Sequence, residues 1–564
     1  MEKKKVTRRK FLKVAGTVGL WLGAAASSLL EACAPKPTPA PAPPEAPTPA
    51  PVPPEAPTPT PVPPTAAPTV VPSVRKDLVV GLHADVPSFG AFTKLGETGP
   101  KVNESIIRRL ARVSHETFQP EPELAVEWAM EDPTTWVIKL REGVQWHKGW
   151  GEVTAEDVEY TINYIVENQA YKYGTGILNV DYVKARSKYV VEVKLTQPFL
   201  AFPQVTMDHG GDICCKKAHL EMGEEEYKIN PIGCGPFQFE EWVSGSHVII
   251  KKFPDYWNPD QPKVEEVVFP IIPDASVRLA ALEKGEIDWM DRINGKDIPR
   301  VRELEGFTFE NVPGWNWDCL AFGFAPYIDA KYVTEDFPTQ IKEVRQAISY
   351  AISRQDIIDA VYYGEGQPSD SPIPEGFPGY RPWPLKYPPE GDLETAKSLM
   401  AQAGVDGFDA EVIGLATMPW HVQELEVIAE QVKPLGINLS ITAVEEGMWH
   451  ERWYEHNFTM GMREISMVSA DTDSCLYWFH RSGAKHWQGW PNAPDEWLDG
   501  ARAETDPEKQ KELYIKITDR VIDECPYIFT GHVNVIRLYD ERLTGFRPWR
   551  VYFIMTLDDV GWTA

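Results

Sequence analysis

A proline-rich segment near the N-terminus limits where this chain can fold. Nearly every second residue from Ala34 to Pro72 is proline, and the ten residues Pro43–Val52 recur as Pro53–Val62 with a single Ala-to-Thr change. Proline lacks the backbone N–H that helices and central strands need, and the residues between the prolines are mostly Ala, Thr and Glu, with little apolar surface to bury. Such a segment favours extended polyproline II and acts as a spacer. We therefore expect the folded body to begin only near Lys76.

The residues before this spacer have the layout of an export signal. Lys3–Lys5 and the adjacent Arg8 and Arg9 precede a mostly apolar run from Val14 to Leu30. The paired arginines, followed by Phe-Leu-Lys, resemble the twin-arginine export motif. An uncleaved transmembrane anchor is the alternative, but the run is at the short end of the ~20 residues that a span needs and is diluted by Gly and Ser. We expect residues 1–33 to direct export.

The end of the apolar run is typical of lipoproteins. Leu30-Glu31-Ala32-Cys33 resembles a cleavage box whose cysteine becomes the acylated first residue of the mature chain. We therefore expect lipidation at Cys33 and attachment to the membrane through this lipid. Residues 34–76 are then a tether that holds the folded body on the order of 100 Å from the bilayer, in the periplasm or on the outer face of the cytoplasmic membrane.

Composition bounds the size of the core and the class of partner. The chain has 564 residues, 43% of them hydrophobic, with 20 Trp, 21 Tyr and 22 Phe, so it is long enough and apolar enough for two or three domains. Its formal net charge of -27 repels nucleic acids and anionic lipid headgroups, which excludes both as partners. Six cysteines follow Cys33, and six cysteines allow 15 pairings that spacing alone does not rank.

Hydrophobic periodicity in the first half predicts strands and helices in alternation. Leu78–Leu82 is typical of a buried strand, while Trp136–Leu140 and Tyr189–Leu195 alternate as half-buried strands do. Thr154–Asp157 has the pattern of a capping box that opens a helix, and Asp274 is placed to cap another helix that ends near Gly285. The first half therefore reads as a mixed α/β body.

The second half is predicted to be richer in helices. Apolar residues recur at helical spacing in 344–352 and 422–432, and alternate as in a strand in 437–443. Helix starts are expected at Ser353, at Asp392 and at Asp506-Pro507, because these residues are favoured N-caps.

Motifs for common enzyme chemistry are absent from the sequence. It contains no GxSxG, no GxGxxG after a strand and no P-loop, so hydrolase, dinucleotide and nucleotide sites lack their minimal parts. Cys214, Cys215 and Cys234, and His480 with His486, are the metal-like groups, but neither has zinc-site spacing, and we expect structural cysteines and solvated histidines. No metal or cofactor is expected. A secreted glycosidase stays open, because an acidic chain always supplies carboxylate pairs.

Tryptophans gather in the segments expected to be loops of the second half. Rings offer a large contact area with few rotatable bonds, which suits a ligand enclosed by protein, although each ring is also a natural core residue. Stacked rings suit sugars as well. The residues concerned are Trp315, Trp317, Trp420, Trp449, Trp453, Trp478, Trp487 and Trp490.

Several sequence blocks, taken in order, resemble the family 5 solute-binding proteins of ABC importers, the peptide and nickel class. The resemblance extends from about residue 77 to the C-terminus. Two departures from the family pattern are Gly149-Trp150-Gly151 after His147 and Phe322-Gly323-Phe324. The blocks are Glu123–Trp128, Leu140–His147, Thr154–Val158, Ile232–Phe237, Val344–Ile352 and Ser371–Pro374.

This resemblance implies a fold and a function. The fold is a two-lobed, periplasmic-binding-protein-like α/β fold of the large peptide-binding type with a discontinuous first lobe: 77–315 with a subdomain at about 106–225, then 316–528 as the second lobe, then a return in 529–564. The implied function is capture of a small solute between the lobes and its delivery to an ABC permease, without catalysis. A di- or oligopeptide is the expected solute and an oligosaccharide the alternative.

The resemblance also implies ligand-binding residues. Asp471, in Ser469-Ala470-Asp471, matches the segment whose carboxylate holds the α-amino group of a peptide in relatives, because a buried ammonium needs a charged acceptor. Arg463 is expected to meet the ligand carboxylate, or to pair with Asp471 in the empty protein. Trp317, Trp478 and Phe89 are further expected contacts. The alternative for Asp471 and Asp473 is that they are solvated acids capping a helix at Ser474–Phe479.

A disulfide between Cys319 and Cys475 is a further implication of the resemblance. It places Cys319 on the first strand of the second lobe and Cys475 in a loop that faces the ligand. Two buried free thiols are the alternative.

Overall fold

The computed structural model describes residues 77–92, 96–168, 179–209, 211–382, 384–467, 471–484 and 486–563, which belong to one compact unit of the chain, 71–564. The export signal, Cys33 and the tether lie outside these residues, so the predictions made for them stay predictions. Among the described residues, no helix combines the length and the hydropathy that crossing a bilayer requires.

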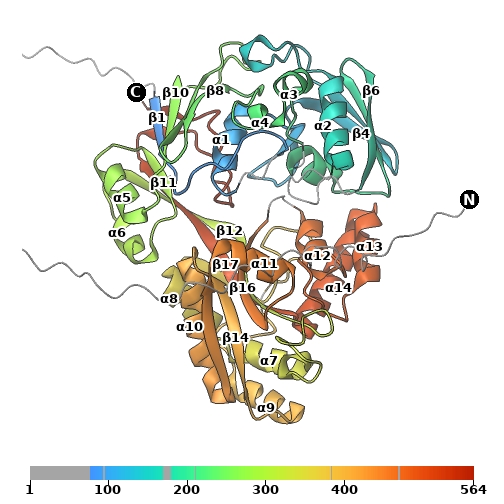
Figure 1. The fold of residues 1–564 in the computed structure, drawn as a ribbon, viewed down its shortest axis with the longest axis vertical. Coiled ribbons are helices and arrows are strands. Elements are labelled where there is room, and N and C mark those ends of the chain that lie inside the picture. Colours follow the sequence, from blue (N-terminus) through green and yellow to red (C-terminus); the bar gives the residue numbers. More distant parts are fainter. Residues whose placement is uncertain are drawn as a thin grey trace, which may run out of the picture. The chain divides into compact units, whose positions relative to one another are not determined.

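A mixed sheet of eleven strands runs through the folded body (Figure 1). The strand order is β15-β14-β16-β12-β17-β11-β1-β10-β9-β8, and β13 pairs with β17. The sheet therefore joins segments from both halves of the sequence. Its strands are β1 (Asp77–Gly81), β8 (Phe237–Val243), β9 (His247–Lys252), β10 (Glu266–Pro270), β11 (Trp289–Asp291), β12 (Phe307–Phe322), β13 (Gly366–Pro368), β14 (Phe408–Leu415), β15 (Ile437–Val444), β16 (Met460–Ser466) and β17 (Tyr527–Asp540).

Two long strands carry this sheet from one lobe into the other. β12 and β17 pair antiparallel from Phe307 opposite Asp540 to Ala321 opposite Tyr527, with irregular register after Val312 and after Asp318. The lobe borders expected at 315/316 and 528/529 fall inside these two strands. The lobes are thus joined by continuous hydrogen-bonded backbone.

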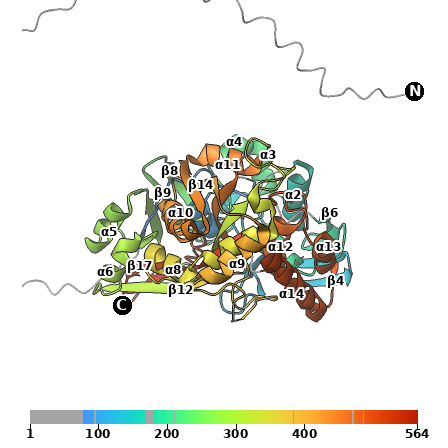
Figure 2. The same ribbon diagram turned by 90° about the horizontal axis from the view of Figure 1, so that it is seen from below.

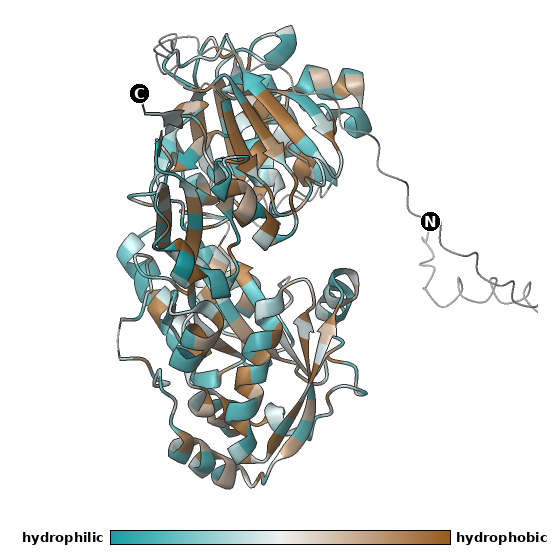
Figure 3. Ribbon diagram, turned by 90° about the vertical axis from the view of Figure 1, so that its left-hand side faces the viewer, coloured by the Kyte–Doolittle hydropathy of each residue, from teal (hydrophilic) through white to brown (hydrophobic). Residues whose placement is uncertain are grey.

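A smaller antiparallel sheet occupies the segment expected as a subdomain. Its order is β4-β5-β7-β6, and the helix that the capping-box pattern predicts at Thr154 packs against β6 and β7. Figure 3 shows hydrophobic residues concentrated on the strands, while the helices carry hydrophilic ones as well. The elements are α2 (Ala155–Asn168), β4 (Ala125–Asp132), β5 (Thr135–Leu140), β6 (Val180–Ser187) and β7 (Val190–Leu195); β2 (Ala111–Val113) with β3 (Pro120–Pro122), and β18 (Leu543–Thr544) with β19 (Gly561–Trp562), form two further pairs.

Helices cover the sheet in the second lobe. Helix α10 packs against β14 and β15, and α12, α13 and α14 contact one another (Figure 2). The predicted N-caps Asp274, Ser353, Asp392 and Asp506 are confirmed, since each side chain accepts a backbone N–H of the first turn. The helices are α1 (Gly99–Ile106), α3 (Lys216–Met222), α4 (Glu224–Tyr227), α5 (Ala275–Glu283), α6 (Ile298–Val301), α7 (Lys342–Ala351), α8 (Arg354–Tyr362), α9 (Leu393–Ala403), α10 (Pro419–Val432), α11 (Glu446–Tyr454), α12 (Thr472–His480), α13 (Asp495–Ala503) and α14 (Pro507–Glu524).

Two of the sequence blocks meet in space at His147. Its Nδ1 accepts from the N–H of Gly233 at 3.3 Å and its Nε2 donates to the carbonyl of Gly235 at 2.9 Å. Both glycines are needed, because a Cβ at Gly233 would lie 1.9 Å from the carbonyl oxygen of Ile106 and one at Gly235 would lie 2.4 Å from that of Ser105. This part of the motif therefore holds a turn against α1.

The block at 344–352 also has a structural role. The guanidinium of Arg345, on α7, donates to the carbonyl oxygens of Thr339 and Gln340 and to those of Glu524 and Cys525 at the end of α14. The arginine thereby satisfies carbonyls that a helix end leaves without partners.

Candidate functional site

Strand β16 presents different chemistry on its two faces. It pairs antiparallel with β12, with Arg463 opposite Cys319 and Glu464 opposite Asp318. Successive side chains of a strand point to opposite faces of the sheet. Arg463 and Cys319 therefore lie on one face, and Glu464 and Asp318 on the other.

Arg463 lies in an aromatic box formed by Trp449, Trp453 and Tyr454 of α11. The guanidinium carbon is 5.2, 4.9 and 5.9 Å from the three ring centroids, distances at which a cation is attracted to an aromatic face. The two indoles stack on each other, with centroids 5.0 Å apart and planes 16° from parallel. Helix α11 thus fixes the position of the guanidinium from one side.

Two nitrogens of the Arg463 side chain carry N–H donors that have no acceptor among the described residues. Its Nε and Nη1 are buried and have no hydrogen-bond partner among the described residues. Buried donors in proteins are nearly always paired, and an arginine offers a planar fork that matches a carboxylate with two parallel bonds. The arrangement is therefore suited to receive an anionic group.

Trp478 belongs to the same aromatic region as Arg463. The ring of Tyr454 is 5.7 Å from that of His486, which in turn is 6.0 Å from Trp478, and the indole of Trp478 is only partly buried. The structure thus brings together two residues that the sequence separates by a loop and most of α12.

Asp471 lies at the start of α12 as its N-cap. Its Oδ1 accepts the backbone N–H of Ser474 at 2.8 Å, and its side chain is buried. Trp478 is seven residues farther along, which corresponds to about 10 Å of helix. The helix-cap alternative is confirmed. The expectation that the two acids are solvated is wrong, because Asp473 is also buried and pairs with Arg502 at 3.0 Å.

Trp317 and Phe89 are core residues in this structure. Trp317 is 0% exposed and packs edge-on against Phe479 and Phe529. Phe89 is also 0% exposed and contacts Phe239 and Trp242. Both rings are therefore part of the core, and neither exposes surface that a ligand could contact.

The expected disulfide between Cys319 and Cys475 is not present in the structure. All six cysteines of the described residues are free and buried. The Sγ of Cys475 lies 3.7 Å from the carbonyl oxygen of Pro372, and burial raises the pKa of both thiols well above the usual value. The alternative of two buried free thiols describes the structure.

The expectation of solvated histidines is corrected as well. His480 is fully buried beside Trp490 and Tyr527, and His486 is buried against Phe479. Burial lowers the pKa of His480 to about 3, so its imidazole is neutral at physiological pH.

The opposite face of β16 borders a cavity of about 410 Å³, a size typical of ligand pockets. Its lining combines charged groups with aromatic rings and comes from both lobes. The residues that define it best are Arg292, Asp318, Tyr362, Trp420, Glu464 and Tyr552.

Three acids lie in this lining or directly behind it: Asp318 and Glu464 line the cavity, and Glu424 contacts the lining residue Tyr362. The hydroxyl oxygen of Tyr362 lies 2.8 Å from Asp318 Oδ2 and also contacts the carboxyl group of Glu424 on α10. Glu464 accepts from Trp420 Nε1 at 3.2 Å and from the hydroxyl of Tyr552. Burial raises the pKa values of Asp318, Glu424 and Glu464, and the proximity of Glu424 raises that of Asp318 further. This face therefore favours neutral or cation-bound carboxyl groups.

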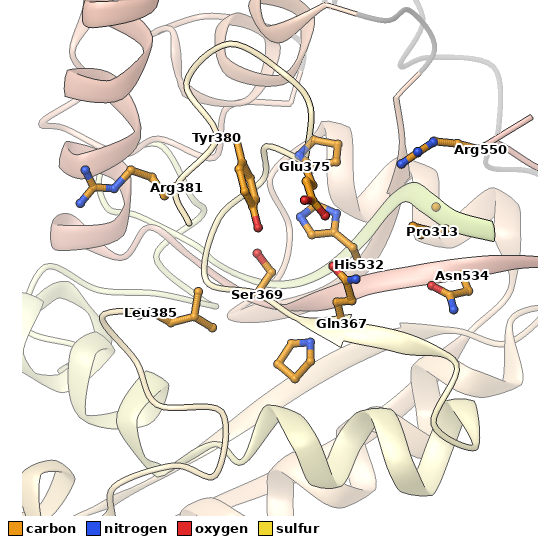
Figure 4. Close-up of a pocket in the computed structure, with 13 residues that line it drawn as sticks. Pro313, Gln367, Ser369, Glu375, Tyr380, Arg381, Leu385, His532, Asn534 and Arg550 are labelled. Carbon is orange, nitrogen blue, oxygen red and sulfur yellow. The ribbon is translucent and has the colours of Figure 1, made fainter. Parts of the chain in front are cut away.

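A second, much smaller cavity lies beside β13 and β17. It holds about 20 Å³, enough for one water molecule and too little for a solute. Figure 4 shows Glu375, Tyr380 and His532 around it, with Gln367 and Ser369 nearby.

Sequence patterns did not single out the acid cluster, although one signal for it exists. His421 and Glu424 occupy the same face of α10 as Leu425 and Ile428, and all four are buried. A carboxylate and an imidazole on the apolar face of a helix mark a buried polar site. Asp318 follows Asn316 on the same face of β12, a polar alternation that is also typical of a strand with one solvent-exposed face, so it did not indicate a buried site.

Comparison with known proteins agrees with this architecture. Residues 119–487, more than half of the chain, match the bacterial extracellular solute-binding proteins, family 5 (middle region). A dipeptide-binding protein of Escherichia coli K12 is 27% identical over 85% of this chain and 94% of its own length, and the glutathione-binding protein GsiB of Shigella boydii is 24% identical over 84% and 92%.

A solved structure gives the same fold. The periplasmic binding protein DppA of Helicobacter pylori, in complex with the peptide STSA, superimposes with a TM-score of 0.73 at 24% identity, over 87% of this chain and 98% of that one. The fold is thus the two-lobed type that the sequence blocks implied. This chain belongs to the family 5 bacterial extracellular solute-binding proteins of ABC importers.

Proposed function

We propose that this protein captures a di- or oligopeptide between its lobes and delivers it to an ABC permease, without catalysing a reaction. Two relatives support the peptide class by what their names say they bind, a dipeptide and glutathione. The observation that carries the proposal is Arg463: a guanidinium held by three rings, with buried N–H groups that have no acceptor among the described residues.

Arg463 would bind the carboxylate of the peptide. A bidentate pair between arginine and carboxylate is among the strongest polar contacts in proteins, and the surrounding rings lower the cost of orienting the side chain. The rings of Tyr454 and Trp478 offer apolar surface for the peptide side chains beside it.

Asp471 stays our proposed contact for the α-amino group of the peptide. It already caps α12, so its two functions must be separated experimentally. Asp471→Asn does this, because asparagine caps a helix as well as aspartate but carries no charge. We expect this variant to lose roughly 2–5 kcal/mol of peptide affinity through faster release. Asp506→Asn, at the cap of α14, is the matched control.

Calorimetry with two ligand pools tests the proposal. One pool contains peptides of two to five residues and the other contains cello- and xylo-oligosaccharides. We expect saturable binding from the peptide pool and loss of that binding in Arg463→Gln. Arg452→Gln is the control, because Arg452 lies on α11 but already pairs with Glu411. Peptide binding that is equally strong in Arg463→Gln would refute the role of Arg463.

An oligosaccharide is the second candidate, favoured by the run of rings from Tyr454 through His486 to Trp478. Sugar binding that survives Arg463→Gln but is lost in Trp478→Ala would establish it in place of the peptide. Turnover of a chromogenic glycoside by the purified protein would instead support a glycosidase.

We also propose that the protein is exported and anchored through lipid on Cys33. The intact mass of the mature protein would show an acylated N-terminus at this residue. Cys33→Ser should release the protein from the membrane fraction. Unchanged retention of this variant would favour an uncleaved anchor.

A further inference from the structure

Three potential metal ligands converge on the face of β16 that lies opposite Arg463. Asp318 comes from β12, Glu464 from β16 and His421 from the first turn of α10. One nitrogen or oxygen of each side chain lies within 4.8 Å of one atom of the other two, and His421 Nε2 is 3.8 Å from Asp318 Oδ1. Asp318 and Glu464 also border the 410 Å³ cavity.

These distances are close to those of a coordination sphere. Two ligands with bonds of about 2.1 Å to a tetrahedral ion lie roughly 3.4 Å apart, so the widest pair would need to approach by roughly 1.4 Å. Binding of an ion would therefore need a small adjustment of these side chains. The cavity leaves space beside the cluster for a further ligand.

His421 has no other evident function in the fold. Its side chain is 2% exposed, and neither ring nitrogen has a hydrogen-bond partner among the described residues. Asp318 Oδ1 is likewise buried and has no such partner there. Leaving a buried polar atom unpaired is costly, and a bound ligand is a common reason for it.

Neighbouring groups hold the carboxylates in place. Tyr362 donates to Asp318 Oδ2 at 2.8 Å, which leaves Oδ1 directed at His421, and Trp420 donates to Glu464 Oε2 at 3.2 Å. Hydrogen bonds from a second layer of this kind orient ligands in known metal sites.

The acidic groups of the region outnumber the cations beside them. Asp318 and Glu424 are buried, and the side chain of Glu464 beside them is 7% exposed. The guanidinium that approaches them, Arg292, is 3.9 Å from Glu464 and is shared with Glu97 at 2.8 Å. Ionised carboxylates here require further positive charge.

We propose that Asp318, His421 and Glu464 bind a divalent transition-metal ion of the zinc or cobalt type. One imidazole and two carboxylates suit such ions better than they suit Mg²⁺ or Ca²⁺, because Mg²⁺ and Ca²⁺ favour oxygen ligands alone. This site is independent of the proposed peptide contact, which lies on the other face of the sheet.

The test uses the untagged full-length chain after treatment with a chelator. Co²⁺ is titrated while visible absorption is recorded, and Zn²⁺ binding is followed by calorimetry. We expect one ion per chain, with the ligand-field bands of a coordinated Co²⁺, and no comparable binding of Mg²⁺ or Ca²⁺.

Matched variants locate the ion. Asp318→Asn keeps the shape of the side chain and should weaken Co²⁺ binding by more than the roughly 10–100-fold typical of second-layer changes, as should His421→Ala. His480→Ala is the control: His480 is equally buried and has no partner at either ring nitrogen among the described residues, but it does not belong to the acid cluster. The His480→Ala variant should bind Co²⁺ with unchanged affinity.

Two results would overturn the proposal: no saturable binding of one Co²⁺ or Zn²⁺ per chain, or binding that Asp318→Asn leaves unchanged. Asp318→Asn decides the question if His421→Ala fails to fold. Arg463→Gln separates this result from the proposed function, because it should abolish peptide binding while Co²⁺ binding persists.

Discussion

The two faces of β16 carry opposite charges. On one face, Arg463 is a cation surrounded by rings, with N–H groups that lack an acceptor among the described residues. On the other, Glu464, Asp318 and Glu424 are acids that lie close together with little cationic compensation. The two kinds of site begin one residue apart in the sequence. The alternation of side chains along a strand is what separates them.

Neither face is built for stability alone. An unpaired buried donor or acceptor typically costs about 1–3 kcal/mol, and each face keeps at least one such atom. Hydrophobic side chains at these positions would avoid that cost. We interpret both faces as binding surfaces for this reason, one for an anion and one for a cation.

The largest effect should come from removing the core ring of Trp317, which lies on the same face of the sheet as Arg463. Trp317→Ala should lower the free energy of unfolding by about 3–5 kcal/mol, because a fully buried indole leaves a cavity. Urea denaturation measures this, and Trp317→Phe should be milder. A loss of peptide affinity with unchanged stability would mean that Trp317 touches the ligand after all.

A smaller change sharpens the role of Arg463. Arg463→Lys keeps the positive charge but removes the planar fork and much of the contact with the rings. We expect peptide affinity to fall by roughly 1–3 kcal/mol, measured by calorimetry. Full affinity in this variant would show that charge alone is recognised, whereas a change in Co²⁺ binding would contradict the separation of the two faces.

Acid should lower the free energy of unfolding because His480 is buried as a neutral imidazole. Its pKa is about 3 in the folded protein and about 6.5 when unfolded, so between these values the unfolded chain binds more protons. Stability is fully present above pH 6.5 and is lost toward pH 3, by up to about 1.4 kcal/mol per pH unit. Urea midpoints across this range should show a shallower slope in His480→Phe.

The smallest effect concerns the cap of α12. Asp471→Ala should lower the free energy of unfolding by about 1 kcal/mol and Asp471→Asn by only a few tenths, because only the first loses the acceptor for the N–H of Ser474. Thermal denaturation distinguishes the two. Equal losses would indicate that the charge of Asp471, rather than its cap, stabilises the helix.

Local patterns predicted helices and strands well in this chain. Asp274, Asp392 and Asp506 cap helices as expected, and 437–443 falls within β15. Caps depend on one side chain and the next few backbone amides, so a short stretch of sequence contains what is needed. The overall fold was predicted from the resemblance of several sequence blocks, in order, to family 5 solute-binding proteins.

The site could be predicted only in part. Arg463 and Trp478 were expected as binding residues and do lie in one aromatic region, although their contact with a ligand stays a prediction. Exposure of Trp317 and Phe89 depends on which elements pack over them, which a single sequence does not encode locally. The approach of Asp318, His421 and Glu464 depends on strand register and on the position of α10, so it became visible only in three dimensions.

The pairing of β12 with β17 has a consequence for the order of folding. Phe307 lies opposite Asp540, and Ala321 opposite Tyr527, so these contacts close loops of more than 200 residues. Contacts of such high contact order form slowly and late. The central sheet is therefore completed only when the last strands arrive, and a chain cut anywhere before Tyr527 would leave β12 with an open edge, exposed to pairing with other molecules.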